Sequence, residues 1–350
     1  MLPTPVFLES NQKNDSQVNL NYRINAKTIR TASFLLGSGL IVWLILSTGV
    51  RSILNDLSRV GTGVLVIFAL ELVADTCNTL GWWYTLPAKE RTGTYCRMFL
   101  VRAAGNAINE STPAASLGGE PAKVILLRGW VSTSAATASL LITKVPYCLA
   151  DTTFIMAGSA LVWTRLTLPP DITLALLIGF SLMLTGILTF AFLQIRGMGA
   201  GALRFLRRLK IPESWLGKLE PFSNEIDSHL SDFYRERKGD LLCAIGSHLC
   251  GFGVNSLQML LLLRWLKLGF DPVAALGIAA FLALFALVGF AVPASLGVLE
   301  GGAVLIFWAL GLPENAAMAT ALSLRLVSLI RIALGLVIFM LLQHKQVASQ

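Results

Sequence analysis

Four stretches of this chain contain no Asp, Glu, Lys or Arg and are long enough to cross a lipid bilayer. They are Thr31–Val50, Ile172–Ile195, Leu241–Leu263 and Val273–Leu299, each of 20 to 27 residues. A helix needs about 20 apolar residues to span the hydrocarbon core. A soluble domain could bury one such helix but hardly four, so we expect an all-α integral membrane protein.

The composition agrees with this class. Hydrophobic residues make up 55% of the chain and charged residues 14%, whereas a soluble domain carries about a quarter charged residues. The net charge of +8 fits basic cytosolic loops better than nucleic-acid binding, because no basic surface with interleaved aromatic residues is present. The five cysteines form no CxxC pair and read as small apolar residues. We expect no cofactor, no metal and no nucleic-acid partner.

The chain divides into a disordered cytosolic tail, a first membrane half, a basic cytosolic connector and a second membrane half, at residues 1–30, 31–195, 196–240 and 241–350. About six full transmembrane helices are predicted, at 31–50, 60–84, 133–163, 171–195, 241–264 and 315–343. Two further segments, 96–128 and 273–311, are interrupted by proline and glycine. Each is either a re-entrant, broken-helix hairpin or a pair of tightly packed spans.

The connector carries the strongest orientation signal. Basic and apolar residues alternate in one short stretch, as Arg204, Phe205, Leu206, Arg207, Arg208, Leu209 and Lys210. Such an amphipathic piece suits an anionic inner leaflet, and basic loops stay in the cytosol. We therefore expect both termini in the cytoplasm. Counting spans, segment 96–128 then enters from the cytosolic face and segment 273–311 from the opposite face.

The two interrupted segments contain nearly the same phrase. Residues 113–120 read PAASLGGE and residues 293–300 read PASLGVLE. The likeness continues downstream, where Lys144 lies nine residues after Ala135 and Arg325 lies nine residues after Ala316. Entry from opposite faces predicts an inverted repeat, an arrangement in which secondary transporters place substrate near the bilayer midplane.

Each phrase joins a helix-breaking proline, small residues that permit a turn, and an acid: Pro113, Gly118, Gly119 and Glu120 in the first, Pro293, Gly297 and Glu300 in the second. Proline removes a backbone donor, and freed backbone groups cannot face lipid. One interpretation is a polar site for an anionic headgroup, formed by half-helix ends. The other is a structural kink whose glutamate caps the freed N–H groups.

Further polar residues inside apolar helices are candidates for the same site. They are Arg102, Asn106, Asn109 and Glu110 on one stripe, Lys144 and Asp151 on one face of the helix at 133–163, and His248. The stripe faces either the protein interior or the membrane interface. A single histidine in a membrane helix more often forms a hydrogen bond to a neighbouring helix than acts as a proton relay.

Glu71 and Asp75 lie four residues apart on one helical face and repel each other if both are ionised. Each charge at mid-bilayer costs about 2.5–3.5 kcal/mol on insertion scales, so most must be paired, hydrated or close to an interface. We predict that this acidic pair meets Lys144 and Arg325. Arg331 is predicted to snorkel to the interface.

The runs at 109–127 and 292–305 resemble two signatures of a flippase-like family. That family includes the transmembrane region of bacterial lysylphosphatidylglycerol synthases and has a hopanoid-associated branch. The resemblance implies an all-helical bacterial inner-membrane protein that moves or holds lipids. It points to Asn109, Pro113, Gly118, Gly119, Glu120, Pro293, Gly297, Glu300 and Arg325. The synthases add a C-terminal aminoacyl-transferase domain that this chain lacks, so no enzymatic activity is expected.

These features predict a lipid translocase or lipid-handling protein that admits a polar headgroup to a central charged cavity. With no P-loop motif in the sequence, transport would be facilitated or driven by a proton or the membrane potential. The expected partners are membrane lipids (anionic phospholipid, aminoacyl lipid or a hopanoid type), with lipid-biosynthetic enzymes and a second copy of the chain as further candidates. The alternative is a non-transporting scaffold that recruits lipid-modifying enzymes through the connector.

Overall fold

The computed structural model describes residues 55, 58, 60–111, 118–163, 170–269, 271–289, 295 and 297–348. Within these ranges every regular element is a helix. The expected tail at 1–30 and the expected span at 31–50 lie outside them, as do the two phrase prolines, Pro113 and Pro293.

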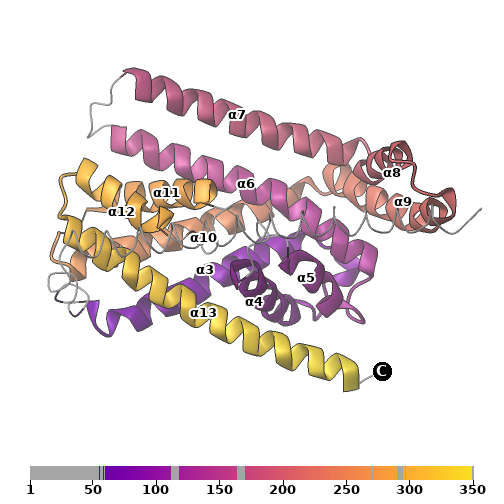
Figure 1. The fold of residues 1–350 in the computed structure, drawn as a ribbon, viewed down its shortest axis with the longest axis horizontal. Coiled ribbons are helices and arrows are strands. Elements are labelled where there is room, and N and C mark those ends of the chain that lie inside the picture. Colours follow the sequence, from indigo (N-terminus) through magenta and orange to yellow (C-terminus); the bar gives the residue numbers. More distant parts are fainter. Residues whose placement is uncertain are drawn as a thin grey trace, which may run out of the picture.

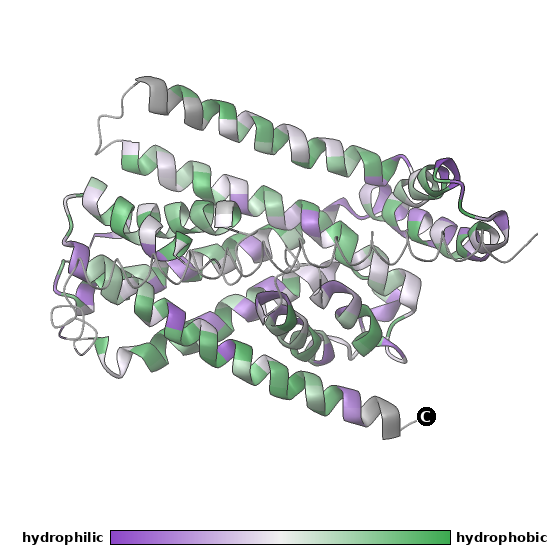
Figure 2. Cartoon of the chain, viewed as in Figure 1, coloured by the Kyte–Doolittle hydropathy of each residue, from purple (hydrophilic) through white to green (hydrophobic). Residues whose placement is uncertain are grey.

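Five helices in the described ranges are long and apolar enough to cross a membrane: α3 (Gly63–Thr85), α6 (Thr133–Trp163), α7 (Pro170–Ile195), α10 (Lys238–Trp265) and α13 (Glu314–Ala348). Each begins within three residues of a predicted span. Figure 2 shows apolar residues along these helices, while hydrophilic residues gather in the part that corresponds to the connector. The all-α membrane class is confirmed.

Each interrupted segment forms two helices separated by a break. The first contains α4 (Tyr95–Ser111) and α5 (Gly119–Leu127), and the second contains α11 (Pro272–Val288) and α12 (Val298–Ala309). At about 1.5 Å per residue, the nine residues of α5 and the twelve of α12 are too short to cross the hydrocarbon core. Helices α4 and α5 lie toward one end of the bundle, and α11 and α12 toward the other (Figure 1).

The connector is helical, which its polar composition alone did not reveal. Helices α8 (Met198–Arg208) and α9 (Glu213–Glu236) extend from the end of the bundle where α7 finishes (Figure 1). The Asp227 carboxylate on α9 accepts hydrogen bonds from the backbone N–H groups of Gly199 (2.7 Å) and Ala200 (2.8 Å) at the start of α8. The Tyr234 hydroxyl donates to Gln194 Oε1 of α7 at 2.7 Å. Burial raises the pKa of Tyr234, which keeps the phenol neutral.

The two membrane halves pack against each other through matched pairs of helices. Helix α3 packs along α10, α4 packs along α13, and α6 packs along α11. Gly158 of α6 lies against Ala280 of α11, where a Cβ on the glycine would overlap the alanine side chain. Gly335 of α13 lies in the same way against Ala103 and Ala107 of α4. Small residues thus let helices from different halves approach closely at two places.

Candidate functional site

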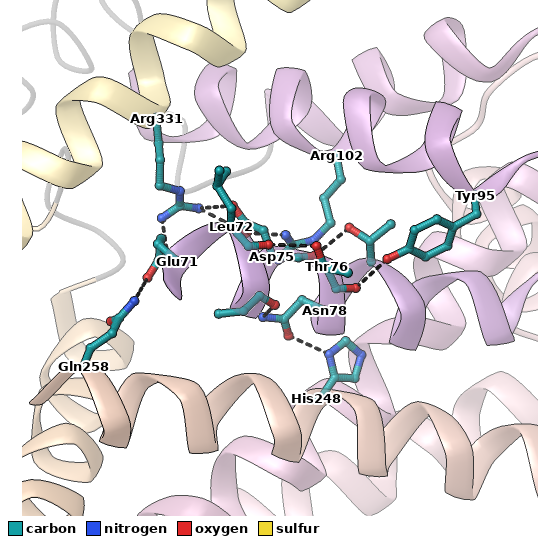
Figure 3. A network of polar contacts seen from close by, with 12 residues as sticks. Glu71, Leu72, Asp75, Thr76, Asn78, Tyr95, Arg102, His248, Gln258 and Arg331 are labelled. Atoms are coloured by element: carbon teal, nitrogen blue, oxygen red, sulfur yellow. Dashed lines mark hydrogen bonds and ion pairs between the residues drawn. The ribbon is translucent and has the colours of Figure 1, made fainter. Parts of the chain in front are cut away.

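A network of charged and polar side chains joins helices α3, α4, α10 and α13 (Figure 3). Arg331 of α13 donates to Glu71 Oε1 at 2.7 Å and lies 3.2 Å from Asp75 Oδ2, both on α3. Arg102 of α4 donates to Asp75 Oδ1 at 2.5 Å. Gln258 of α10 donates to Glu71 Oε2 at 2.9 Å. These five residues, hereafter the central network, tie helices from both membrane halves together.

The positive charges of the central network offset the repulsion between Glu71 and Asp75. Glu71 and Asp75 are one helical turn apart, and two guanidinium groups balance their charges. The side chains of the ion-paired members are only 13–21% exposed. Our prediction that this acidic pair meets Lys144 and Arg325 is therefore wrong. The prediction that Arg331 snorkels is also wrong, because its guanidinium turns inward to α3 and bridges both carboxylates.

The first phrase places Glu120 near the start of α5, where it meets two lysines. Its Oε1 atom accepts from Lys123 at 3.1 Å and from Lys144 of α6 at 3.0 Å. Asn109 of α4 accepts from the Gly119 backbone N–H at 2.6 Å, and its amide nitrogen lies 3.5 Å from Glu120 Oε1. Gly118 stands at the N-cap position of α5.

Glycines bring α4 and α5 together here. Gly119 lies against the backbone oxygen of Gly105, and the Lys123 side chain lies across Gly105. A Cβ at either glycine would overlap these neighbours, so the buried lysine depends on both of them.

The second phrase places Glu300 in the first turn of α12, where it meets one arginine. Arg325 of α13 donates to Glu300 Oε1 from Nε at 2.9 Å and from Nη2 at 2.6 Å. Glu300 Oε2 accepts from the Gly297 backbone N–H at 2.9 Å. Gly297 has φ 78°, a left-handed conformation that favours glycine. The Glu300 side chain is 1% exposed, so this acid both caps the helix and neutralises a buried arginine.

The polar stripe of α4 faces the protein interior. Arg102 contacts α3, Asn109 contacts α5, and Glu110 accepts from Ser328 of α13 at 3.1 Å. Asn106 is partly buried on the same helix. Of the two interpretations left open, the interior one therefore holds for these residues. Asp151 is buried on α6, and the structure does not bring it into an ion pair with any described residue.

His248 joins α10 to α3. Its Nδ1 atom lies 2.8 Å from Asn78 Oδ1, and Tyr147 of α6 packs edge-on against the imidazole. Gly81 makes room for the ring, because a Cβ there would overlap it. This geometry supports the interpretation that His248 links two helices through a hydrogen bond.

Sequence reasoning missed several members of these sites: Asn78, Lys123, Gln258, Ser328 and the pairing role of Arg331. Lys123 gave a usable signal, because it lies three residues after Glu120 and so shares its helical face. Gln258 and Asn78 gave none, since single amides in long apolar helices have no distinctive spacing. In the part of the chain that the structure describes, no group of three His, Cys, Asp or Glu side chains could hold a metal ion.

The fold and these paired charges can be compared with known proteins. Residues 30–335 match the family model described as the lysylphosphatidylglycerol synthase TM region. The chain belongs to this family. The matched range covers the predicted first span, both phrases, the central network and most of α13. The match does not distinguish the hopanoid-associated branch. No curated protein and no solved structure gives a significant match.

Proposed function

We infer that this protein translocates or handles membrane lipids by admitting their polar headgroups to the charged interior of the bundle. Membership of a membrane lipid-related family supports the general role. The observation that carries the proposal is the central network, in which Arg331 of the second half pairs with Glu71 and Asp75 of the first. A headgroup that passes between the halves would meet paired charges. These side chains could exchange their protein partners for the charged groups of the lipid.

The depth of the basic residues supports a pathway through the bilayer. Lys144 and Arg325 each lie eleven residues after the first residue of their helices, α6 and α13. At about 1.5 Å per residue, both lie about 16 Å from the start of helices that are long and apolar enough to span the roughly 30 Å hydrocarbon core. Charges at this depth are costly on a lipid-facing surface and are typical of substrate pathways.

The contact pattern supports an inverted repeat. We define the first unit as α4, α5 and α6, and the second unit as α11, α12 and α13. Each unit pairs an acid in the first turn of its short helix with a basic residue on its long helix. Gly158 of the first unit's long helix contacts Ala280 of α11, and Gly335 of the second unit's long helix contacts Ala103 of α4, so each long helix meets the first helix of the other unit. The short helices lie toward opposite ends of the bundle (Figure 1).

The same geometry supports the proposed orientation. Helices α8 and α9, with their basic residues, lie at the end of the bundle to which the C-terminal end of α13 points (Figure 1). Because basic segments stay in the cytosol, we propose that this end and the C-terminus face the cytoplasm of a bacterial inner membrane. The α4–α5 pair then approaches from the cytoplasmic side and the α11–α12 pair from the other.

A second candidate function rests on a different surface. Phe205 and Leu209 of the α8 region and Trp215 of α9 are 59–69% exposed, beside exposed arginines. This surface would suit a scaffold that recruits lipid-modifying enzymes. We rank it below translocation because a scaffold does not need a network of paired charges between the two membrane halves.

Translocation is tested by reconstituting the full chain into vesicles that contain lipids labelled on the headgroup. A membrane-impermeant quencher then reports how fast inner-leaflet label reaches the outside. Phosphatidylglycerol, an aminoacyl phosphatidylglycerol and phosphatidylcholine are assayed in parallel. Translocation predicts a rate above that of protein-free vesicles for at least one lipid. Rates equal to protein-free vesicles for all three, with correctly folded protein, would favour the scaffold.

A further inference from the structure

We propose that Lys123 and Lys144 form a binding site for the phosphate of an anionic lipid headgroup, and that the equivalent pair in the second unit, Glu300 and Arg325, is a closed structural contact. The three residues Glu120, Lys123 and Lys144 are called the lysine site below. The proposal deepens the proposed function, on which it rests, by naming the charge class of the substrate and the unit that binds it.

The charges of the lysine site do not balance. Among the described residues, Glu120 is the one carboxylate paired with either Lys123 or Lys144. Two ammonium groups therefore share one carboxylate, and three ionised groups carry a net charge of +1. An uncompensated cation in a low-dielectric region is costly. A bound phosphate would remove this cost, because it supplies the missing negative charge.

The hydrogen bonds of Glu120 also favour a bound ligand. Both lysines donate to Oε1, whereas Oε2 is buried and accepts no hydrogen bond from any residue that the structure describes. A buried acceptor without a donor costs about 1–3 kcal/mol. A headgroup that carries a hydroxyl or ammonium donor beside its phosphate would satisfy Oε2 and the excess positive charge together. Phosphatidylglycerol has the phosphate, a net negative charge and glycerol hydroxyls as donors. Phosphatidylcholine also has a phosphate, but its headgroup carries no N–H or O–H donor and no net charge.

The side chains of Lys123 and Lys144 differ in exposure, and this gives them different roles. The Lys123 side chain is 8% exposed and is held across Gly105, so it is fixed in place. The Lys144 side chain is 48% exposed although it lies within α6, a helix long and apolar enough to span the membrane. A half-exposed ammonium at this depth can turn from Glu120 to an incoming anion, while Lys123 keeps the carboxylate paired. Lys144 is thus the residue that a headgroup reaches first.

The second unit offers a direct comparison. Glu300 is 1% exposed, Arg325 is 15% exposed, and their opposite charges cancel. The second carboxylate oxygen of Glu300 is satisfied by the Gly297 N–H. The features that point to a ligand in the first unit, excess charge, an unpaired acceptor and an exposed cation, are replaced here by a sealed pair.

The experiment measures which lipids the purified full chain retains. Protein in non-ionic detergent is mixed with equal amounts of phosphatidylglycerol and phosphatidylcholine, and bound lipids are counted by native mass spectrometry. Wild-type protein should prefer phosphatidylglycerol. Lys144→Gln should lower that preference about tenfold, the factor that corresponds to losing one charge-assisted hydrogen bond of about 1.4 kcal/mol. Lys144→Arg should retain most of it.

Arg208→Gln is the matched control, because it removes one positive charge from an exposed position of α8 and tests general attraction to anionic lipid. It should leave the preference unchanged. Equal preference in wild type and Lys144→Gln, or an equal loss in Arg208→Gln, would overturn the proposal. Inorganic phosphate alone is a further arm. Thermal stabilisation by phosphate as large as that by phosphatidylglycerol would identify a soluble anion and also overturn the lipid assignment.

The failure of this inference can be distinguished from the failure of the proposed function. If Lys144 sets the lipid preference but reconstituted vesicles show no translocation, the lysine site stands and translocation fails. If vesicles translocate phosphatidylglycerol and phosphatidylcholine equally, with no effect of Lys144→Gln, translocation stands and the lysine site fails.

Discussion

The first and second units share a plan and differ in how they treat their charges. In both, a glutamate in the first turn of a short helix meets a basic residue eleven residues into the following long helix. In the first unit a second cation, Lys123, joins them, and Lys144 stays half exposed. In the second unit the pair is sealed. One framework can therefore hold an open, positively charged site or a closed ion pair.

The largest expected effect on stability comes from breaking the sealed pair. Arg325→Gln leaves the Glu300 carboxylate buried without its counter-charge, and removing one partner of a buried ion pair costs about 3–5 kcal/mol. Denaturant unfolding in detergent should show a loss of this size. Lys144→Gln, at the matching position of the first unit, is the comparison. Equal losses in the two variants would contradict the distinction between closed and open units.

The glycine contacts between halves should give an intermediate effect. Gly158→Ala inserts a methyl group against Ala280, and Gly335→Ala inserts one against Ala103 and Ala107. Overpacking of this kind costs about 1–3 kcal/mol. If the units are related by a repeat, both variants should be destabilised by similar amounts in thermal unfolding.

Gly179→Ala provides the control for the glycine substitutions. Gly179 lies within α7, where an added Cβ would meet nothing within 4 Å. Alanine favours a helix over glycine, so this variant should be as stable as wild type or slightly more so. A loss at Gly179 equal to that at Gly158 and Gly335 would show that the two contacts between halves are not close.

The smallest expected effect on stability belongs to Lys144→Gln. When Lys144 is replaced, Lys123 still pairs with Glu120, so the carboxylate keeps a counter-charge. Stability should therefore change by less than about 1 kcal/mol, while lipid preference changes strongly. A loss of several kcal/mol would instead make Lys144 a structural residue like Arg325.

The sequence was sufficient for the spans and for the position of the two breaks. Uncharged runs of bilayer length predict α7 and α10 directly, and the repeated phrase marks the short helices α5 and α12. Hydropathy depends only on residues near each other in the chain, so it needs no knowledge of packing. The predicted tail and first span lie outside the described residues and stay predictions.

The partners of the buried charges could not be predicted in the same way. Helical spacing shows that Glu71 and Asp75 share a face, but it does not show which helix that face meets. The answer depends on α13 packing along α4, a long-range contact that brings Arg331 to the acids instead of Lys144 or Arg325. The helical connector escaped prediction because its stability depends on packing of α9 against α6 and α7.

The central claim is that charges shared between the two halves carry the headgroup across the membrane. The most direct test is the rate of phosphatidylglycerol translocation in vesicles containing wild type, Arg331→Gln or the exposed control Arg208→Gln. Arg331→Gln leaves Glu71 without its guanidinium partner, so we predict a rate at least about tenfold lower, the effect of losing about 1.4 kcal/mol or more. Arg208→Gln should match wild type. Folded Arg331→Gln protein that translocates at the wild-type rate would contradict the account.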